Sequence, residues 1–200
     1  DTIFHGRKEE LSNLIEAIRE NSVVIVHGSA GTGKTRIALE AIRRFSSEDE
    51  YRLLCVKNNN QPIYEDLIAK IDQPGSYLLF VDDANELSGL AQIIQYITRD
   101  KDEYSVKVVL TVRDYAKEPV FLIANKYTVP KMFSLLQFSD NDIKEFLNIN
   151  MGITNDLYVD QIIKIAEGNP RIAYMTGKIA KDTQSLSAVN DASQVYEQWI

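Results

Sequence analysis

The fold is most clearly indicated by one run of eight residues, Gly28-Ser29-Ala30-Gly31-Thr32-Gly33-Lys34-Thr35. This run, called the phosphate loop below, matches the pattern GxxxxGK[ST] at every fixed position. A short β-branched segment at 23–26 precedes it, and a segment with helical spacing follows. The glycines let successive backbone N–H groups point at an anion, and the following helix adds the positive end of its dipole. The run therefore predicts phosphate binding, with the Lys34 ammonium reaching the β- and γ-phosphates of a nucleotide.

Strand-like and helix-like patterns alternate from residue 11 to residue 112. The expected strands are 23–26, 51–56, 77–81 and 106–112, and the expected helices are about 11–18, 36–45, 63–71 and 86–98. Such alternation is typical of βαβ units, which build a parallel sheet covered by helices on both faces. The sequence predicts an α/β fold with a parallel sheet of about five strands, four of which these patterns locate.

The pattern changes after Phe138, because apolar positions then keep a helical period and no further strand-like run occurs. Ser139 resembles an N-cap with acids in the first turn, and a second helix is expected to stop at Gly168. Asn169 and Pro170 have the pattern of a cap followed by a first-turn proline. We expect a nucleotide-binding domain at 1–138 and a C-terminal helical lid at 139–200.

The amino-acid composition argues against some kinds of binding partner and some kinds of site. The formal net charge of −7 disfavours DNA as a partner, since nucleic-acid affinity rests mainly on cations that neutralise phosphates. One cysteine and two histidines cannot build a disulfide framework or a Cys/His zinc site. We expect Cys55 to be a small buried residue.

No apolar run approaches the length of a membrane span, and the N-terminus has no basic-then-apolar signal segment. We therefore expect a cytoplasmic protein without a membrane partner. The chain begins at Asp1 without a methionine and ends in a mixture of large apolar residues. We expect it to be a piece of a longer protein.

Two acids follow the most apolar expected strand. Leu78-Leu79-Phe80-Val81 precedes Asp82 and Asp83, which is a Walker B pattern. Acids at the carboxyl end of a buried parallel strand lie in the crevice where such sheets bind ligands. Asp82 is the candidate for holding Mg²⁺ together with the Thr35 hydroxyl. Asp83 is the candidate for orienting or deprotonating the attacking water, the alternative being that it caps the next helix.

The next expected strand, 106–112, is followed by Arg113. A cation at such a strand end can face the γ-phosphate from the side opposite Lys34. We predict that Arg113 reports whether that phosphate is present. The alternative is an ordinary exposed arginine.

Several motifs in this order resemble the STAND-type NTPases, the signalling branch of P-loop ATPases that includes the NACHT and NB-ARC families. They are Phe4-His5-Gly6-Arg7, the phosphate loop, Asp82-Asp83 and Thr111-Val112-Arg113. Gly168-Asn169-Pro170 resembles the GxP motif by which those families close over the nucleotide. The resemblance spans nearly the whole chain, although only the phosphate loop is specific alone. No separate winged-helix segment is evident, which departs from the NB-ARC pattern.

The resemblance implies ATP or ADP with Mg²⁺ as ligands, and slow ATP hydrolysis. It places Ile3 and Phe4 near the adenine and Pro170 against the base or ribose, although plain core packing would also explain Phe4. Arg171 resembles the second sensor arginine of AAA+ proteins, and an ordinary surface arginine is the alternative. The resemblance further implies nucleotide-gated homo-oligomerisation, a region that senses a protein ligand and a separate effector domain. Within the STAND class, the chain resembles the prokaryotic antiviral (Avs-like) ATPases.

These arguments assign roles to individual residues. The predicted catalytic residues are Lys34, Asp83 and Arg113. The predicted metal ligands are Thr35 and Asp82. The predicted nucleotide-binding residues are Gly28, Ser29, Ala30, Gly31, Thr32, Gly33, Lys34, Thr35, Arg36, Ile3, Phe4, Pro170 and Arg171.

Three other functions share the phosphate loop. An AAA+ ATPase of the origin-recognition or clamp-loading kind, acting on DNA, shares the Gly6-Arg7 start and a helical lid, but usually has Asp-Glu where this chain has Asp82-Asp83. A nucleotide or small-molecule kinase would normally bring lid arginines to a second substrate, and the later region is poor in them. A nucleotide-bound scaffold would hydrolyse ATP negligibly.

Overall fold

The computed structural model of the protein describes residues 6–56, 63–99, 104–183, 185 and 191–197. The chain forms two compact units. The sheet unit comprises Glu9–Gly28 and Lys34–Leu135, and the helical unit comprises Asp1–Lys8, Ser29–Gly33 and Leu136–Ile200. The phosphate loop is therefore divided, since its middle groups with the helical unit and its two ends group with the sheet unit.

The sheet unit is built on five parallel strands in the order β2-β3-β4-β1-β5. The strands are β1 (Val23–Gly28), β2 (Arg52–Val56), β3 (Gly75–Val81), β4 (Tyr104–Arg113) and β5 (Lys131–Ser134). The alternation of strands and helices thus gave the correct fold class. Every residue of β1, which lies between β4 and β5, is buried, as expected for an interior strand of a parallel sheet with both faces covered.

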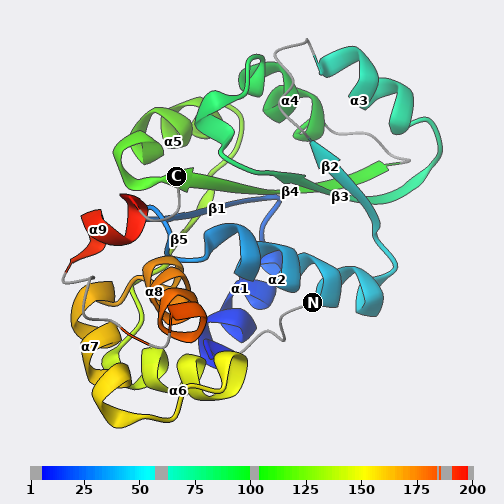
Figure 1. The fold of residues 1–200 in the computed structure, drawn as a ribbon. Coiled ribbons are helices and arrows are strands. Elements are labelled where there is room, and N and C mark those ends of the chain that lie inside the picture. The colour runs from blue at the N-terminus through cyan, green and yellow to red at the C-terminus, as the bar shows by residue number, and fades with distance from the viewer. Residues whose placement is uncertain (1–5, 57–62, 100–103, 184, 186–190, 198–200) are drawn as a thin grey trace. The chain divides into compact units, whose positions relative to one another are not determined.

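Helices cover the two faces of this sheet (Figure 1). They are α1 (Lys8–Glu20), α2 (Lys34–Asp49), α3 (Tyr64–Lys70), α4 (Leu90–Ile97) and α5 (Lys117–Asn125), with short 3-10 helices η1 (Ala84–Glu86) and η2 (Asp114–Ala116). Figure 1 shows α3, α4 and α5 on one face, and α1 and α2 on the other. Alternate strand residues such as Val23 and Ile25 pack into one core with residues of α3, α4 and α5. The period-two geometry of strands sends the intervening residues to the opposite face.

The helix expected at about 86–98 is interrupted in the structure. A 3-10 turn, η1, occupies Ala84–Glu86, and α4 begins only at Leu90. Gly89 adopts a left-handed conformation with φ +83°, which breaks the helical path between them. The apolar spacing alone did not reveal this break.

Both edges of the sheet differ from what the sequence suggested. The fifth strand, β5, had not been located, because its residues are half-buried or exposed and its side chains give no strong apolar pattern. The preceding helix α5 had not been located either. At the other edge, Cys55 on β2 is exposed, so the expectation of a buried cysteine was wrong. An edge strand has a neighbour on one side only, and this leaves more of its side chains in water.

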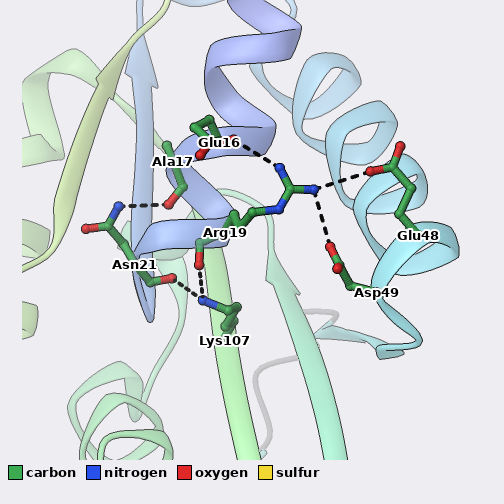
Figure 2. Close-up of polar contacts among 7 residues, drawn as sticks. All are labelled: Glu16, Ala17, Arg19, Asn21, Glu48, Asp49 and Lys107. Atoms are coloured by element: carbon green, nitrogen blue, oxygen red, sulfur yellow. Dashed lines mark hydrogen bonds and ion pairs between the residues drawn. The ribbon is translucent and has the colours of Figure 1, made fainter.

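A lysine joins the end of α1 to strand β4 (Figure 2). The Lys107 ammonium donates hydrogen bonds to the carbonyl oxygens of Arg19 (2.9 Å) and Asn21 (3.1 Å). A cation at this position matches the negative end of the helix dipole. Burial lowers the pKa of Lys107, and the carboxylate of Asp49 acts in the opposite direction. The Arg19 side chain meanwhile reaches Glu48 and Asp49 at the end of α2.

The helical unit contains α6 (Asp140–Met151), α7 (Asp156–Ala166), α8 (Pro170–Thr183) and α9 (Ala192–Glu197). The first three share an apolar core that includes Ile143, Leu147 and Ile162. The predicted helix starts are confirmed. Ser139 forms a capping box with Asp142, and Asn169 caps α8, whose first residue is Pro170. None of the helices in the described part of the chain combines the length and apolar character of a membrane-spanning segment.

Candidate functional site

In the sheet unit, the strand register brings the predicted acids and cations to one edge. Gly28 at the end of β1 lies opposite Arg113 at the end of β4. Val81 at the end of β3 lies opposite Leu110 of β4, and Asp82 follows it directly. The polar residues after β3 and at the end of β4 therefore meet beside the start of α2. This is the edge where parallel sheets bind ligands.

The Asp82 carboxylate is held by two threonine hydroxyls. Thr35 in the first turn of α2 donates to Asp82 Oδ1 at 2.8 Å. Thr111 on β4 donates a short hydrogen bond to the same oxygen. Thr111 is fully buried, whereas Thr35 is exposed. The two predicted metal ligands, Thr35 and Asp82, are thus in direct contact, and Thr111 fixes the carboxylate from the sheet side.

Asp83 lies in a strained backbone conformation beside the same threonine. Its φ of 44° and ψ of 55° are left-handed, a region that aspartate enters more readily than most residues. Its backbone N–H donates to Thr111 Oγ1 at 3.0 Å. Asp83 occupies the N-cap position of η1, but its side chain makes no capping hydrogen bond there. Its carboxylate instead lies 3.7 Å from the Arg113 guanidinium, and both side chains are well exposed.

Lys34 is buried at the start of α2. Its ammonium donates to the carbonyl oxygen of Gly28 at 3.0 Å. Burial lowers the pKa of Lys34, while the carboxylates of Asp83 and Asp114 raise it. A buried cation so close to several carboxylates is suited to an anionic ligand, whose charge would offset the cost of burial. Five predicted residues are brought together here, namely Lys34, Thr35, Asp82, Asp83 and Arg113.

The sequence reasoning missed a further polar pair in the sheet unit. His27, the residue before the phosphate loop, places Nδ1 2.9 Å from Asp114 Oδ1. His27 is buried in β1, and Asp114 begins η2 directly after Arg113. The two are 87 positions apart, so no local pattern in the sequence connects them.

In the helical unit, the middle of the phosphate loop is shaped by glycines and internal hydrogen bonds. Gly31 and Gly33 have φ values of +80° and +91°, which side chains rarely tolerate. Thr32 Oγ1 donates to the Ser29 carbonyl oxygen at 2.9 Å. The side-chain amide of Asn169 donates to the Ala30 carbonyl oxygen, also at 2.9 Å. The Gly168-Asn169-Pro170 segment is thus in contact with the loop through Asn169, which the sequence had suggested as a helix cap and as the middle residue of a GxP-like motif.

The other predicted nucleotide-binding residues lie on α2, on α8 or outside the described residues. Pro170 is half-buried in the first turn of α8, and Arg171 beside it is exposed. Arg36 is exposed on α2. Ile3 and Phe4 lie outside the described residues. The nearby Arg7 is buried, donates to the Leu136 carbonyl oxygen at 2.6 Å and stacks on Phe138, 4.5 Å from the ring centre.

Comparison with known families gives a match over residues 7–118, to the family described as Novel STAND NTPase 5. The chain belongs to this family. It is accordingly a STAND-class P-loop NTPase module, as the motifs had indicated. A comparison with curated protein sequences finds no match.

Solved structures share the fold of this STAND module. The Orc1 protein of Aeropyrum pernix, solved in complex with DNA, is 18% identical with a TM-score of 0.63, and the match covers 98% of this chain and 65% of Orc1. The RuvB Holliday junction branch migration motor of Thermotoga maritima is 20% identical with a TM-score of 0.62, covering 96% and 68%. A Walker-type ATPase of Pyrococcus abyssi is 11% identical with a TM-score of 0.59, covering 98% and 71%. The module thus spans about two thirds of each of these chains.

The donor atoms of Thr35 and Asp82 are of the kind that a divalent cation uses in nucleotide sites. Within the described residues, no cluster of three or more His, Cys, Asp or Glu side chains is arranged to hold a metal. The hydroxyl of Thr35 and the carboxylate of Asp82 are hard oxygen donors in contact with each other. Mg²⁺ in nucleotide sites typically uses one or two carboxylates and completes its shell with water and substrate phosphates. A STAND NTPase is expected to use its nucleotide together with such a divalent ion.

Proposed function

We propose that this STAND module binds ATP, hydrolyses it slowly and acts as a switch whose nucleotide state controls oligomerisation of a longer signalling protein. The supporting observation is the contact between Thr35 and Asp82. It joins the residue after the phosphate-loop lysine to the acid at the end of β3. These are the two side chains that would share a magnesium ion in a P-loop NTPase.

Each residue of the sheet edge has a distinct proposed role. The Lys34 ammonium would bind the β- and γ-phosphates. Thr35 and Asp82 would hold Mg²⁺, which when bound supplies positive charge to the phosphate oxygens. Thr111 would keep Asp82 oriented by its hydrogen bond. None of these residues has to form a covalent bond, since phosphoryl transfer relies mainly on positioning and charge stabilisation.

We propose that Asp83 orients the attacking water and accepts its proton. Its carboxylate is 3.7 Å from the Arg113 guanidinium, which would partly neutralise it. A γ-phosphate would compete for the Arg113 guanidinium and release Asp83 for the water. Arg113 would then report the presence of the γ-phosphate, and ADP would leave the Arg113–Asp83 pair in place.

The proposed switch rests on the resemblance to the STAND class, which gives the nucleotide ligands in both the nucleotide-binding domain and the helical lid. A nucleotide that touches both parts would bias their relative orientation. Pro170 and Arg171 would add contacts from the lid, and the hinge would lie near residues 136–140. The bias is limited by the difference in affinity for the two orientations, typically about 1–3 kcal/mol in allosteric proteins.

In the longer protein, this movement would expose a surface for self-assembly in response to a protein ligand bound elsewhere. A role in antiviral defence in the cytoplasm follows from the resemblance to Avs-like ATPases. The isolated module would then be largely monomeric and turn ATP over slowly.

The second candidate is an AAA+ ATPase that acts on DNA. The likeness to Orc1, solved with DNA, and to RuvB favours it. The net charge of −7 opposes it, because DNA binding draws on clustered cations. Turnover measured with and without duplex DNA separates the two functions. Stimulation by DNA would favour the AAA+ candidate over the signalling switch.

The switch is tested by the distance between labels on the two units. Cys55, the only cysteine, is exposed on β2 and takes one label. Leu157→Cys on α7 provides the second, at a residue that is 79% exposed. We expect different label distances with ADP and with a non-hydrolysable ATP analogue. Identical distances in a protein that binds both nucleotides would favour the scaffold alternative.

A further inference from the structure

The Asn169 side chain makes two kinds of contact at once. Its Oδ1 accepts hydrogen bonds from the backbone N–H groups of Arg171 (3.0 Å) and Ile172 (3.3 Å), and so caps α8. Its Nδ2 donates to the carbonyl oxygen of Ala30 in the phosphate loop, 139 positions earlier in the chain. One amide group therefore links the first turn of a lid helix to the loop.

The neighbouring Gly31 makes this contact possible. A Cβ at Gly31 would lie 2.6 Å from Asn169 Oδ1 and 2.8 Å from Nδ2, closer than real Cβ atoms approach other groups. Gly31 is not one of the fixed glycines of the GxxxxGK[ST] pattern. The lack of a side chain at Gly31 leaves room for the Asn169 amide, and its φ of +80° also favours glycine at this position.

The bond to Ala30 also determines the direction of a backbone donor. The peptide between Ala30 and Gly31 is planar and trans, so its C=O and N–H bonds point in opposite directions. Because Asn169 holds the carbonyl on one side, the Gly31 N–H must point to the other side. A phosphate loop binds its anion with inward N–H groups, so their direction before binding affects affinity.

We propose that Asn169 is a positioning residue that orients the Ala30–Gly31 peptide of the phosphate loop for the phosphates of a nucleoside di- or triphosphate. This inference rests on the proposed nucleotide binding and adds a residue to it. Asn169 couples the loop to α8, since a change of the Ala30 peptide on phosphate binding alters the same amide that caps the helix. The link lies entirely within the helical unit.

The test compares Asn169→Ser with Asn155→Ser. Serine is as good an N-cap as asparagine but is too short to keep the bond to Ala30. Asn155 is a matched control, because its Oδ1 caps α7 through Leu157 and Tyr158. We expect Asn169→Ser to weaken ATP and ADP binding by roughly 3- to 10-fold in calorimetry, the effect of one hydrogen bond, and Asn155→Ser to leave both affinities unchanged. A cap alone would make the two variants behave alike, and that result would overturn the proposal.

A second variant and a measurement on the unchanged protein support the same test. Asn169→Asp keeps the cap but places a carboxylate oxygen against the Ala30 carbonyl, so we expect it to weaken binding more than serine does. In the unchanged protein, the Asn169 side-chain N–H protons should exchange slowly with solvent by NMR. Fast exchange would overturn the proposal.

The outcomes also separate this inference from the proposed function. If Lys34→Ala loses ATP binding while Asn169→Ser binds normally, nucleotide binding stands and the role of Asn169 is wrong. If the unchanged protein binds no nucleotide, both are wrong.

Discussion

The sheet unit and the helical unit hold their parts of the candidate site in different ways. At the sheet edge, Asp82 and Asp83 directly follow a buried strand, and the fully buried Thr111 contacts both. In the helical unit, one bond from the Asn169 amide links the Ala30 carbonyl to α8. Side chains fixed by a buried core keep one arrangement, whereas a loop peptide oriented by a side chain from a neighbouring helix can change when that bond changes. The sheet edge is thus suited to the chemistry, and the loop to sensing the ligand.

The largest expected effect is on hydrolysis, at the sheet edge. Asp83→Asn should leave ATP binding with Mg²⁺ intact but slow hydrolysis by about 10²–10⁴-fold, because it removes only the carboxylate that would accept the proton of water. Single-turnover phosphate release together with calorimetric affinity measures both quantities. If Asp83→Asn hydrolyses ATP normally while Asp82→Asn does not, the two roles are reversed.

The next effect is on nucleotide binding, at the lysine of the phosphate loop. Lys34→Ala should weaken ATP binding by about 30- to several-thousand-fold, the range for truncating one partner of a buried charge contact. Calorimetry or fluorescence titration measures it, with circular dichroism as the control for folding. Unchanged affinity in a folded variant would show that the loop does not bind phosphates.

A smaller effect, on stability, is expected when the same threonine-to-valine substitution is made at the sheet edge and in the helical unit. Thr111→Val leaves the Asp83 N–H without its acceptor, and should lower the free energy of unfolding by about 1–3 kcal/mol and slow hydrolysis. Thr176→Val is the matched control. Thr176 is also fully buried, but its hydroxyl donates to the Ile172 carbonyl within α8. Urea unfolding should show a clearly smaller loss for Thr176→Val, and equal losses would contradict the special role of Thr111.

The smallest effect is a pH dependence of binding. Burial lowers the pKa of Lys34 in the free protein, and bound phosphates should raise it again. At a pH between the pKa of Lys34 in the free protein and its higher pKa with bound phosphates, ATP binding takes up a proton. The affinity for ATP should therefore fall as the pH rises through the pKa of the free protein. Calorimetry in two buffers of different ionisation enthalpy measures this uptake.

Asp114→Asn sharpens the pH test. The Asp114 carboxylate raises the pKa of Lys34, so removing it should shift the proton uptake to lower pH. An unshifted uptake would mean that another group takes up the proton.

Local patterns accounted for much of this molecule. The phosphate loop, the helix starts at Ser139 and Asn169, and four of the strands each depend on neighbouring residues, whose spacing and cap chemistry are visible in the sequence. The Asp82-Asp83 pair was likewise visible, because the acids directly follow an apolar run. In these cases the physical cause acts over one or two turns or along one strand.

Only the tertiary structure decided which distant residues meet. The register of β1, β3 and β4 brings Thr111 to Asp82 and His27 to Asp114, and chain folding brings Asn169 to Ala30. The edge position of β2 exposes Cys55, and the edge strand β5 lacks an apolar pattern because it is only half covered. Such contacts depend on the pairing of whole strands and on which neighbours cover them, and no spacing within one segment records either.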